Sequence, residues 1–159
     1  MTNTNDLYLP RDLLNSEGFK SLSKIATTVY LGFRMNCQVT RTKTPSGRKK
    51  EWVITNNGKI EYTYKKAEAN GITRPRFQRA IDELVEKGFI DIERQGSGGI
   101  KGYASLYAIS DRWKKWGTQD FEHKSRVKDD RKGRGWQRYW ENKSSIMGND
   151  NVNREGGLE

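Results

Sequence analysis

The clearest pattern of hydrophobic and polar positions lies between residues 73 and 87. Its apolar residues recur at intervals of three and four, which places them on one face of an α-helix, while the opposite face is polar throughout. The Thr73 hydroxyl is suited to cap the first turn, Pro75 costs nothing within that turn, and Gly88 is a typical C-terminal stop. The pattern predicts an amphipathic helix with an apolar face made of Phe77, Ala80, Ile81, Leu84 and Val85.

Two weaker helical patterns come earlier in the chain. Apolar residues over 22–33 predict a helix capped by Ser21 or Ser23. Gly32 inside it costs up to about 1 kcal/mol relative to alanine.

A shorter helix is predicted to begin at Tyr64, with Thr63 as its cap. Asn70 and Gly71 follow it and are suited to a tight turn. A short helix, a tight turn and a longer helix are the parts of a helix-turn-helix arrangement.

Alternating apolar and polar residues predict strands in two places. Around Asn57 and Gly58 the alternation runs on both sides, and an Asn-Gly pair in that context is the strongest short hairpin signal. We therefore expect a hairpin in which Trp52 and Ile54 precede the turn and Ile60 and Tyr62 follow it.

A second hairpin is predicted after Gly88, from a strand at 89–92 and a partner at 102–109. The connection between them is rich in glycine, so it is suited to a hairpin tip and not to a helix. We expect a wing over 94–102, with Arg94 and Lys101 at its base.

The remaining segments are predicted to be less regular. Residues 1–20 read as an extended lead-in with one helical turn, and the main domain is expected over 21–117. Within it, residues 38–51 are expected to form a mobile basic loop. Residues 118–143 are predicted to form a basic, aromatic tail that could be helical, and residues 144–159 are expected to be disordered.

Composition adds an expectation about partners. The chain has 159 residues, a formal net charge of +10 and only 33% hydrophobic residues. Its isoelectric point is near 9.7 and its mean hydropathy is −0.99. This surplus of positive charge favours phosphate-rich partners such as nucleic acid over acidic small molecules.

Charge is distributed unevenly along the helix at 73–87. Its N-terminal half is basic and its C-terminal half is acidic, the reverse of what the helix dipole favours. An external polyanion at the N-terminal end would account for that order. The candidate DNA-contacting residues are therefore Thr73, Arg74, Arg76, Gln78 and Arg79 in the helix, Arg94 and Lys101 in the wing, and Arg48, Lys49 and Lys50 in the basic loop.

No enzymatic motif stands out, so we expect a protein that is not an enzyme. The chain lacks a phosphate-binding glycine loop ending in Lys-Ser or Lys-Thr, a G-x-S-x-G elbow and an H-E-x-x-H motif, although carboxylates alone could still serve a nuclease. Cys37 and His123 are too few for a zinc site, and no cofactor or small-molecule ligand is indicated. A leader peptide and a membrane span are not evident, so a cytoplasmic protein is expected.

The run ITRPRFQRAIDELVEKGFIDI, followed by a glycine-rich hairpin and YASLYAISDRW, resembles the winged helix-turn-helix proteins of bacteria and their phages and plasmids. Within that group it is similar to small replication-associated proteins, and the resemblance covers about residues 20–117. It implies an α+β fold with three main helices, a small antiparallel sheet and a hairpin wing.

The same resemblance implies binding of double-stranded DNA through the helix at 73–87, supported by the wing at 94–102. The role would be that of a transcriptional regulator or a replication factor of a mobile element. Two alternatives stay open: a winged helix that serves as a protein–protein adaptor, and RNA or single-strand binding through the tail at 118–143. Formation of a homodimer is also open, because the first helix and the tail could each form an interface.

Overall fold

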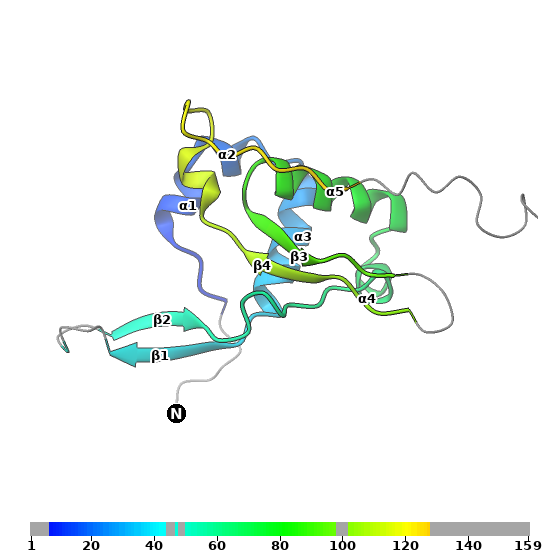
Figure 1. Ribbon diagram of the computed structural model, residues 1–159, viewed down its shortest axis with the longest axis horizontal. Helices are drawn as coiled ribbons and strands as arrows, with labels where there is room; N and C mark the ends of the chain where they lie inside the picture. The colour runs from blue at the N-terminus through cyan, green and yellow to red at the C-terminus, as the bar shows by residue number, and fades with distance from the viewer. Residues whose placement is uncertain (1–6, 44–46, 48–49, 98–101, 128–159) are drawn as a thin grey trace, which may run out of the picture. The chain divides into compact units, whose positions relative to one another are not determined.

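The computed structural model describes residues 7–43, 47, 50–97 and 102–127 (Figure 1). The chain divides into two compact units after Arg126, and all of these residues except Val127 belong to the first. Their fold is α+β. It contains the helices α1 (Arg11–Asn15), α2 (Glu17–Lys20), α3 (Lys24–Met35), α4 (Tyr64–Ala69) and α5 (Arg74–Glu86), the strands β1 (Val39–Lys43), β2 (Lys50–Ile54), β3 (Ile90–Arg94) and β4 (Leu106–Ile109), and the 3-10 helix η1 (Arg112–Lys115).

Helices α3 and α5 pack against each other and supply much of the core (Figure 1). The apolar face predicted for α5 is buried along its whole length, from Phe77 to Val85. Ser23 caps α3 as predicted, since its Oγ accepts a hydrogen bond from the Ala26 N–H at 3.2 Å. The largest fully buried side chains are Tyr30, Phe33, Phe77, Phe89, Ile60, Leu84, Ile90 and Val29.

Gly32 within α3 is explained by a close contact and not by flexibility. A Cβ atom at this position would lie 2.5 Å from Cε1 of Tyr62, which is closer than real Cβ contacts allow. The Tyr62 ring packs edge-on against Phe33 and against Phe77 of α5. Glycine at position 32 lowers the helix propensity, but the absence of a Cβ atom leaves room for the Tyr62 ring, which joins α3 to α5.

The α4–turn–α5 segment forms as the sequence predicts. Thr63 caps α4 by accepting a hydrogen bond from the Lys66 N–H, and the turn at Asn70 and Gly71 leads into α5. Gly88 ends α5 with φ of +80°, a conformation that glycine adopts without strain.

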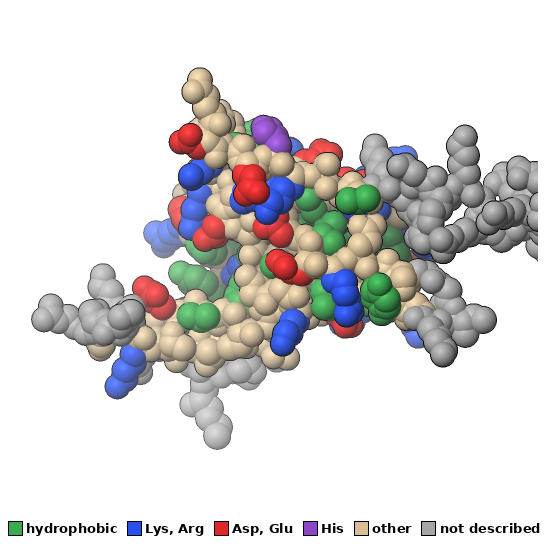
Figure 2. Space-filling view, in the orientation of Figure 1, with side chains coloured by type: hydrophobic (Ala, Val, Ile, Leu, Met, Phe, Trp, Pro, Cys, Tyr) green, Lys and Arg blue, Asp and Glu red, His purple; other side chains and the backbone are tan. Residues whose placement is uncertain are grey.

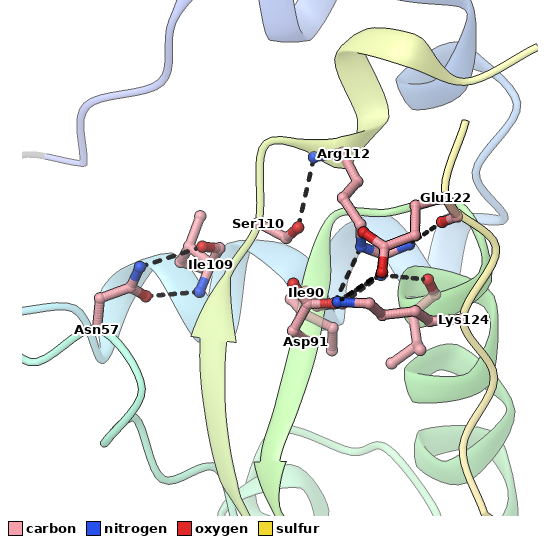
Figure 3. A network of polar contacts seen from close by, with 9 residues as sticks. Asn57, Ile90, Asp91, Ile109, Ser110, Arg112, Glu122 and Lys124 are labelled. Atoms are coloured by element: carbon pink, nitrogen blue, oxygen red, sulfur yellow. Dashed lines mark hydrogen bonds and ion pairs between the residues drawn. The ribbon is translucent and has the colours of Figure 1, made fainter. Parts of the chain in front are cut away.

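Strands β3 and β4 form the predicted antiparallel pair, with Ile90 opposite Ile109 and an irregularity between Ile92 and Arg94. A third segment lies on the other side of β4. Ile60 exchanges two backbone hydrogen bonds with Tyr107, and the Asn57 side chain binds both the N–H and the carbonyl of Ile109 (Figure 3).

The prediction of a hairpin around Asn57 and Gly58 is wrong, because its two segments do not pair with each other. Strand β2 pairs instead with the preceding strand β1, so that Val39 faces Ile54 and Lys43 faces Lys50. The Asn57 side chain is engaged with Ile109, and the chain after Gly58 joins the β3–β4 sheet. Much of the predicted loop at 38–51 is consequently strand. We call this pair, residues 39–43 and 50–54, the β1–β2 ribbon.

The ends of the described chain also differ from expectation. The described part of the predicted lead-in, residues 7–20, contains two short helices in place of one turn, and Ser16 caps the second of them by accepting a hydrogen bond from the Phe19 N–H. Beyond η1, residues 119–127 have no regular secondary structure, whereas the predicted tail helix over 128–143 and the predicted disorder over 144–159 lie outside the described residues. Within the described chain, the longest helices are too short or too polar to cross a lipid bilayer.

Candidate nucleic-acid interface

The N-terminal half of α5 is open to solvent. The helix begins after Thr73, Pro75 lies in its first turn, and that turn contains no acidic residue. Thr73 occupies the cap position as predicted, but its hydroxyl makes no capping hydrogen bond, contrary to expectation. The positive end of the helix dipole is therefore neither capped by a side chain nor neutralised by a carboxylate of the first turn.

The polar residues predicted for this half of the helix fall into two groups. Arg74 and Gln78 both contact Tyr64, the first residue of α4. The Arg74 guanidinium lies 4.4 Å from the centre of the Tyr64 ring, and the Gln78 Nε2 donates to the Tyr64 hydroxyl at 2.9 Å. Tyr64 thus fixes two polar side chains of α5 on the flank that faces α4.

Arg76 and Arg79 form the second group. Both lie on the open side of the helix, and neither makes a hydrogen bond, ion pair or ring contact with the described part of the chain. They are three residues apart in sequence, so they lie on the same side of the helix, away from the buried face. Their guanidinium groups are available to an external acceptor.

Two of the three acidic residues in the second half of α5, Asp82 and Glu83, have partners within the described chain. Glu83 accepts hydrogen bonds from the N–H and Oγ of Ser23, the cap of α3, and from Nζ of Lys87. Burial alone would raise the pKa of Glu83, but these hydrogen bonds and the Lys87 charge outweigh it and hold the pKa below its usual range.

Asp82 is likewise engaged, because both of its carboxylate oxygens bind Arg126. Asp82 and Glu83 of α5 therefore have a structural role in tertiary contacts, whereas Glu86 is exposed. The reversed charge order along the helix needs an external explanation only for its basic half.

Hairpin β3–β4 carries an exposed cation, Arg94, which lies against the exposed ring of Tyr103. The Arg94 guanidinium lies 4.6 Å from the centre of the Tyr103 ring, and its Nη2 is 3.4 Å from the Ala104 carbonyl. A bridge between Ser97 and Tyr103 extends the pairing toward the tip. Of the predicted wing residues, Arg94 is on the described surface and Lys101 lies outside the described residues.

The residues predicted in the basic loop fall mostly outside the described part of the chain. Arg48 and Lys49 are not among the described residues, and Lys50 is the first residue of β2. On the face seen in Figure 2, Lys and Arg side chains are interspersed with Asp and Glu. The side chains on that face therefore do not form a uniformly positive surface.

A polar network centred on Arg112 was not anticipated from sequence. Arg112 binds the Asp91 carboxylate at 2.7 Å and donates to the carbonyls of Val85 and Glu122, so it joins α5, β3 and the segment after η1 (Figure 3). Lys124 also approaches Asp91, at 3.8 Å. No local sequence signal identifies this network, since its members are far apart along the chain.

The arrangement offers hydrogen-bond donors and cations. In the described part of the chain, His, Cys, Asp and Glu side chains do not gather in groups of three that could hold a metal ion. Burial raises the pKa of the Cys37 thiol, which disfavours the reactive thiolate. Comparison with protein families, with curated proteins and with solved structures finds no match for this chain.

Proposed function

We propose that this chain binds double-stranded DNA without catalysing a reaction, as a winged helix-turn-helix protein. The observation that supports the proposal is the contrast between the basic and the acidic side chains of α5. Arg76 and Arg79 lack partners among the described residues, whereas Asp82 and Glu83 are bound by other parts of the chain. The surface that this helix offers to a partner is therefore basic at its N-terminal half.

Groove geometry gives these residues their roles. The major groove of B-DNA is about 12 Å wide and accommodates a helix whose N-terminal side chains reach the base edges. Arg76 and Arg79 would read bases, since arginine pairs with the O6 and N7 atoms of guanine through two hydrogen bonds.

Other residues of the same region would position the helix. The uncapped first turn after Thr73 presents backbone N–H groups to a phosphate, and Arg74 is held in place by its stacking on Tyr64. Gln78 is oriented by its hydrogen bond to Tyr64, and reading adenine would require it to exchange that bond.

The β3–β4 hairpin supports the proposal as a wing. Arg94 lies on its exposed surface against Tyr103, where it could follow the phosphate backbone or enter the adjacent minor groove. Lys101, predicted at the base of the wing, would act in the same way. A role in transcription or in replication of a mobile element rests on the sequence resemblance, because this geometry serves either.

The test compares two variants that lose the same charge from helical positions. A duplex enriched from a random pool by the wild-type protein serves as ligand. We expect Arg76→Ala/Arg79→Ala to weaken binding by about 1–3 kcal/mol for each arginine that pairs with a base. The control Arg11→Ala/Lys24→Ala, on α1 and α3, should bind nearly as the wild type does.

The proposal would be overturned by equal binding of the wild type and the triple variant Arg74→Ala/Arg76→Ala/Arg79→Ala. In that case duplex affinity would not depend on α5. A protein–protein adaptor would then be the better description of the fold.

A further inference from the structure

The side chains of the β1–β2 ribbon are largely exposed. Every residue of β1 is exposed, and Trp52 and Val53 of β2 keep 46% and 44% of their surface accessible. Hydrophobic side chains are visible on the ribbon at the lower left of Figure 2. An isolated pair of strands is marginally stable in water, so a ribbon of this kind gains from a partner.

The strand register separates two kinds of side chain. Residues paired across two strands point to the same face, and successive pairs alternate between faces. The pairs Thr40–Val53 and Thr42–Glu51 lie on one face, which contains the carboxylate. The other face, which we call the basic face, carries Val39, Arg41, Lys43, Trp52 and Ile54.

Within the basic face, a cation rests on an aromatic ring. The Arg41 guanidinium lies 5.7 Å from the centre of the Trp52 ring. Stacking of this kind orients the guanidinium plane and leaves its N–H groups at the edge free to donate. Arg41 is thus held in a position from which it can bind an anion.

The base of the ribbon is fixed to the body beside α4. Asn56 accepts from the Gln38 N–H at 2.8 Å and donates to the Asn36 carbonyl at 3.0 Å, and Lys66 of α4 donates to the Asn36 side chain. From this base the ribbon extends away from the described end of the β3–β4 hairpin, which lies on the opposite side of the view in Figure 1. A partner that contacts both must therefore be long.

We propose that the basic face of the β1–β2 ribbon is a second contact with double-stranded DNA, on the backbone flanking the segment bound by α5. This inference rests on the function proposed above. Charge complementarity selects the partner, because Arg41 and Lys43 share this face while the carboxylate of Glu51 lies on the other, and a duplex presents a long line of phosphates. A second copy of the chain would place like charges against each other on this face.

The experiment measures affinity as a function of duplex length at low salt. Mixed-sequence duplexes of about 12 and about 40 base pairs are compared, since about one helical turn suffices for a single helix in the major groove. The ribbon variant is Arg41→Ala/Lys43→Ala, and Thr40→Ala/Thr42→Ala on the opposite face is the matched control. Arg11→Ala/Lys24→Ala controls for the loss of two charges elsewhere.

We expect the ribbon variant to lose most of the affinity that the wild type gains on the longer duplex, while binding the short duplex as the wild type does. Its salt dependence on the long duplex should flatten by about two in the slope of log K against log salt, one for each phosphate contact removed. Both controls should retain the wild-type dependence on length.

Two failures can be told apart. If Arg76→Ala/Arg79→Ala weakens binding but the ribbon variant matches the wild type at both lengths, this inference is overturned and the proposed function stands. If neither variant affects binding at any length, the proposed function itself fails. Tighter binding to single-stranded DNA of equal length, abolished by Trp52→Ala, would overturn the duplex assignment in favour of base stacking.

Discussion

Asp82 in α5 binds Arg126, a residue beyond the last strand, through two hydrogen bonds: Oδ1 accepts from Nε at 2.6 Å and Oδ2 accepts from Nη2 at 3.1 Å. The hydrogen bonds to Asp82 raise the pKa of Arg126 further above its already high value, so the guanidinium stays charged. Asp82 lies four residues after Gln78 and so on the same side of α5. Arg126, the last residue of the first unit, is therefore held beside the helix proposed to read DNA.

The first prediction concerns this pair. Arg126→Ala should release the segment immediately before Arg126 from α5, so its amide hydrogens should exchange faster with solvent, as measured by mass spectrometry. Global unfolding should change by less than about 1 kcal/mol, because the pair is partly exposed. Lys124→Ala is the control, since Lys124 lies in the same segment and its contact with Asp91 is longer. Unchanged exchange in Arg126→Ala would show that the segment is held by other contacts.

The second prediction concerns acid stability. Because the folded pKa of Glu83 is lowered, its carboxylate contributes stability above the unfolded pKa of about 4.3, and this contribution is lost as pH falls through the folded value. Urea unfolding at pH 7 and pH 3 should therefore show a smaller pH dependence in Glu83→Gln than in the wild type. Glu86→Gln, an exposed neighbour on the same helix, should behave as the wild type does. An equal pH dependence in both variants would contradict the role given to Ser23 and Lys87.

The third prediction concerns alkaline stability. Burial raises the pKa of Tyr30 to about 12, although the nearby Arg34 charge acts in the opposite direction. The unfolded chain loses this proton near pH 10, so stability should decline between about pH 10 and 12 by roughly 2 kcal/mol.

Tyr30→Phe should reduce that decline without abolishing it, because burial also raises the pKa of Tyr107. At pH 7 the variant should be as stable as the wild type or more so, because the buried hydroxyl has no hydrogen-bond partner among the described residues. Tyr8→Phe, an exposed position, is the control. If Tyr30→Phe lost as much stability as the wild type over this pH range, the decline would have to be assigned to another group.

The elements that sequence predicts well are those whose signals are local. The helices α3, α4 and α5 follow from apolar spacing and from caps at Ser23 and Thr63, because neighbours three and four residues apart decide which face is buried. The strands β3 and β4 follow from their alternation and from the glycine-rich connection between them. Each of these signals lies within the element itself or immediately beside it.

Pairing over longer distances was not predictable in the same way. Alternation marks residues 50–54 as a strand, but it does not say whether the partner precedes or follows it. The Asn-Gly signal favoured the later partner, whereas the Asn57 side chain is bound to Ile109, which is 52 residues away. The local preference for a hairpin turn is overridden by that tertiary contact.

The candidate site shows the same limit. Charge order made Arg74, Arg76, Gln78 and Arg79 candidates for contact with DNA, but it did not predict that Tyr64 would contact two of them. Nor could the partners of the acidic residues be foreseen, since Ser23 and Arg126 are distant from α5 in sequence. Contacts between helices depend on packing angles that a single sequence does not encode locally.

The side chain of Asn57 has a consequence for the ageing of the protein. An asparagine followed by glycine loses its amide group readily when the backbone nitrogen of the glycine can attack the side-chain carbon. Here the side chain is held at both ends, since Oδ1 accepts from the Ile109 N–H at 2.7 Å and Nδ2 donates to the Ile109 carbonyl at 3.2 Å. Deamidation would replace the donor with a carboxylate oxygen facing that carbonyl, and the edge of β4 would lose one of its two bonds to residue 57. The contact with Ile109 thus restrains one of the two Asn-Gly sites of the chain against deamidation, and each local opening of this edge exposes that site again.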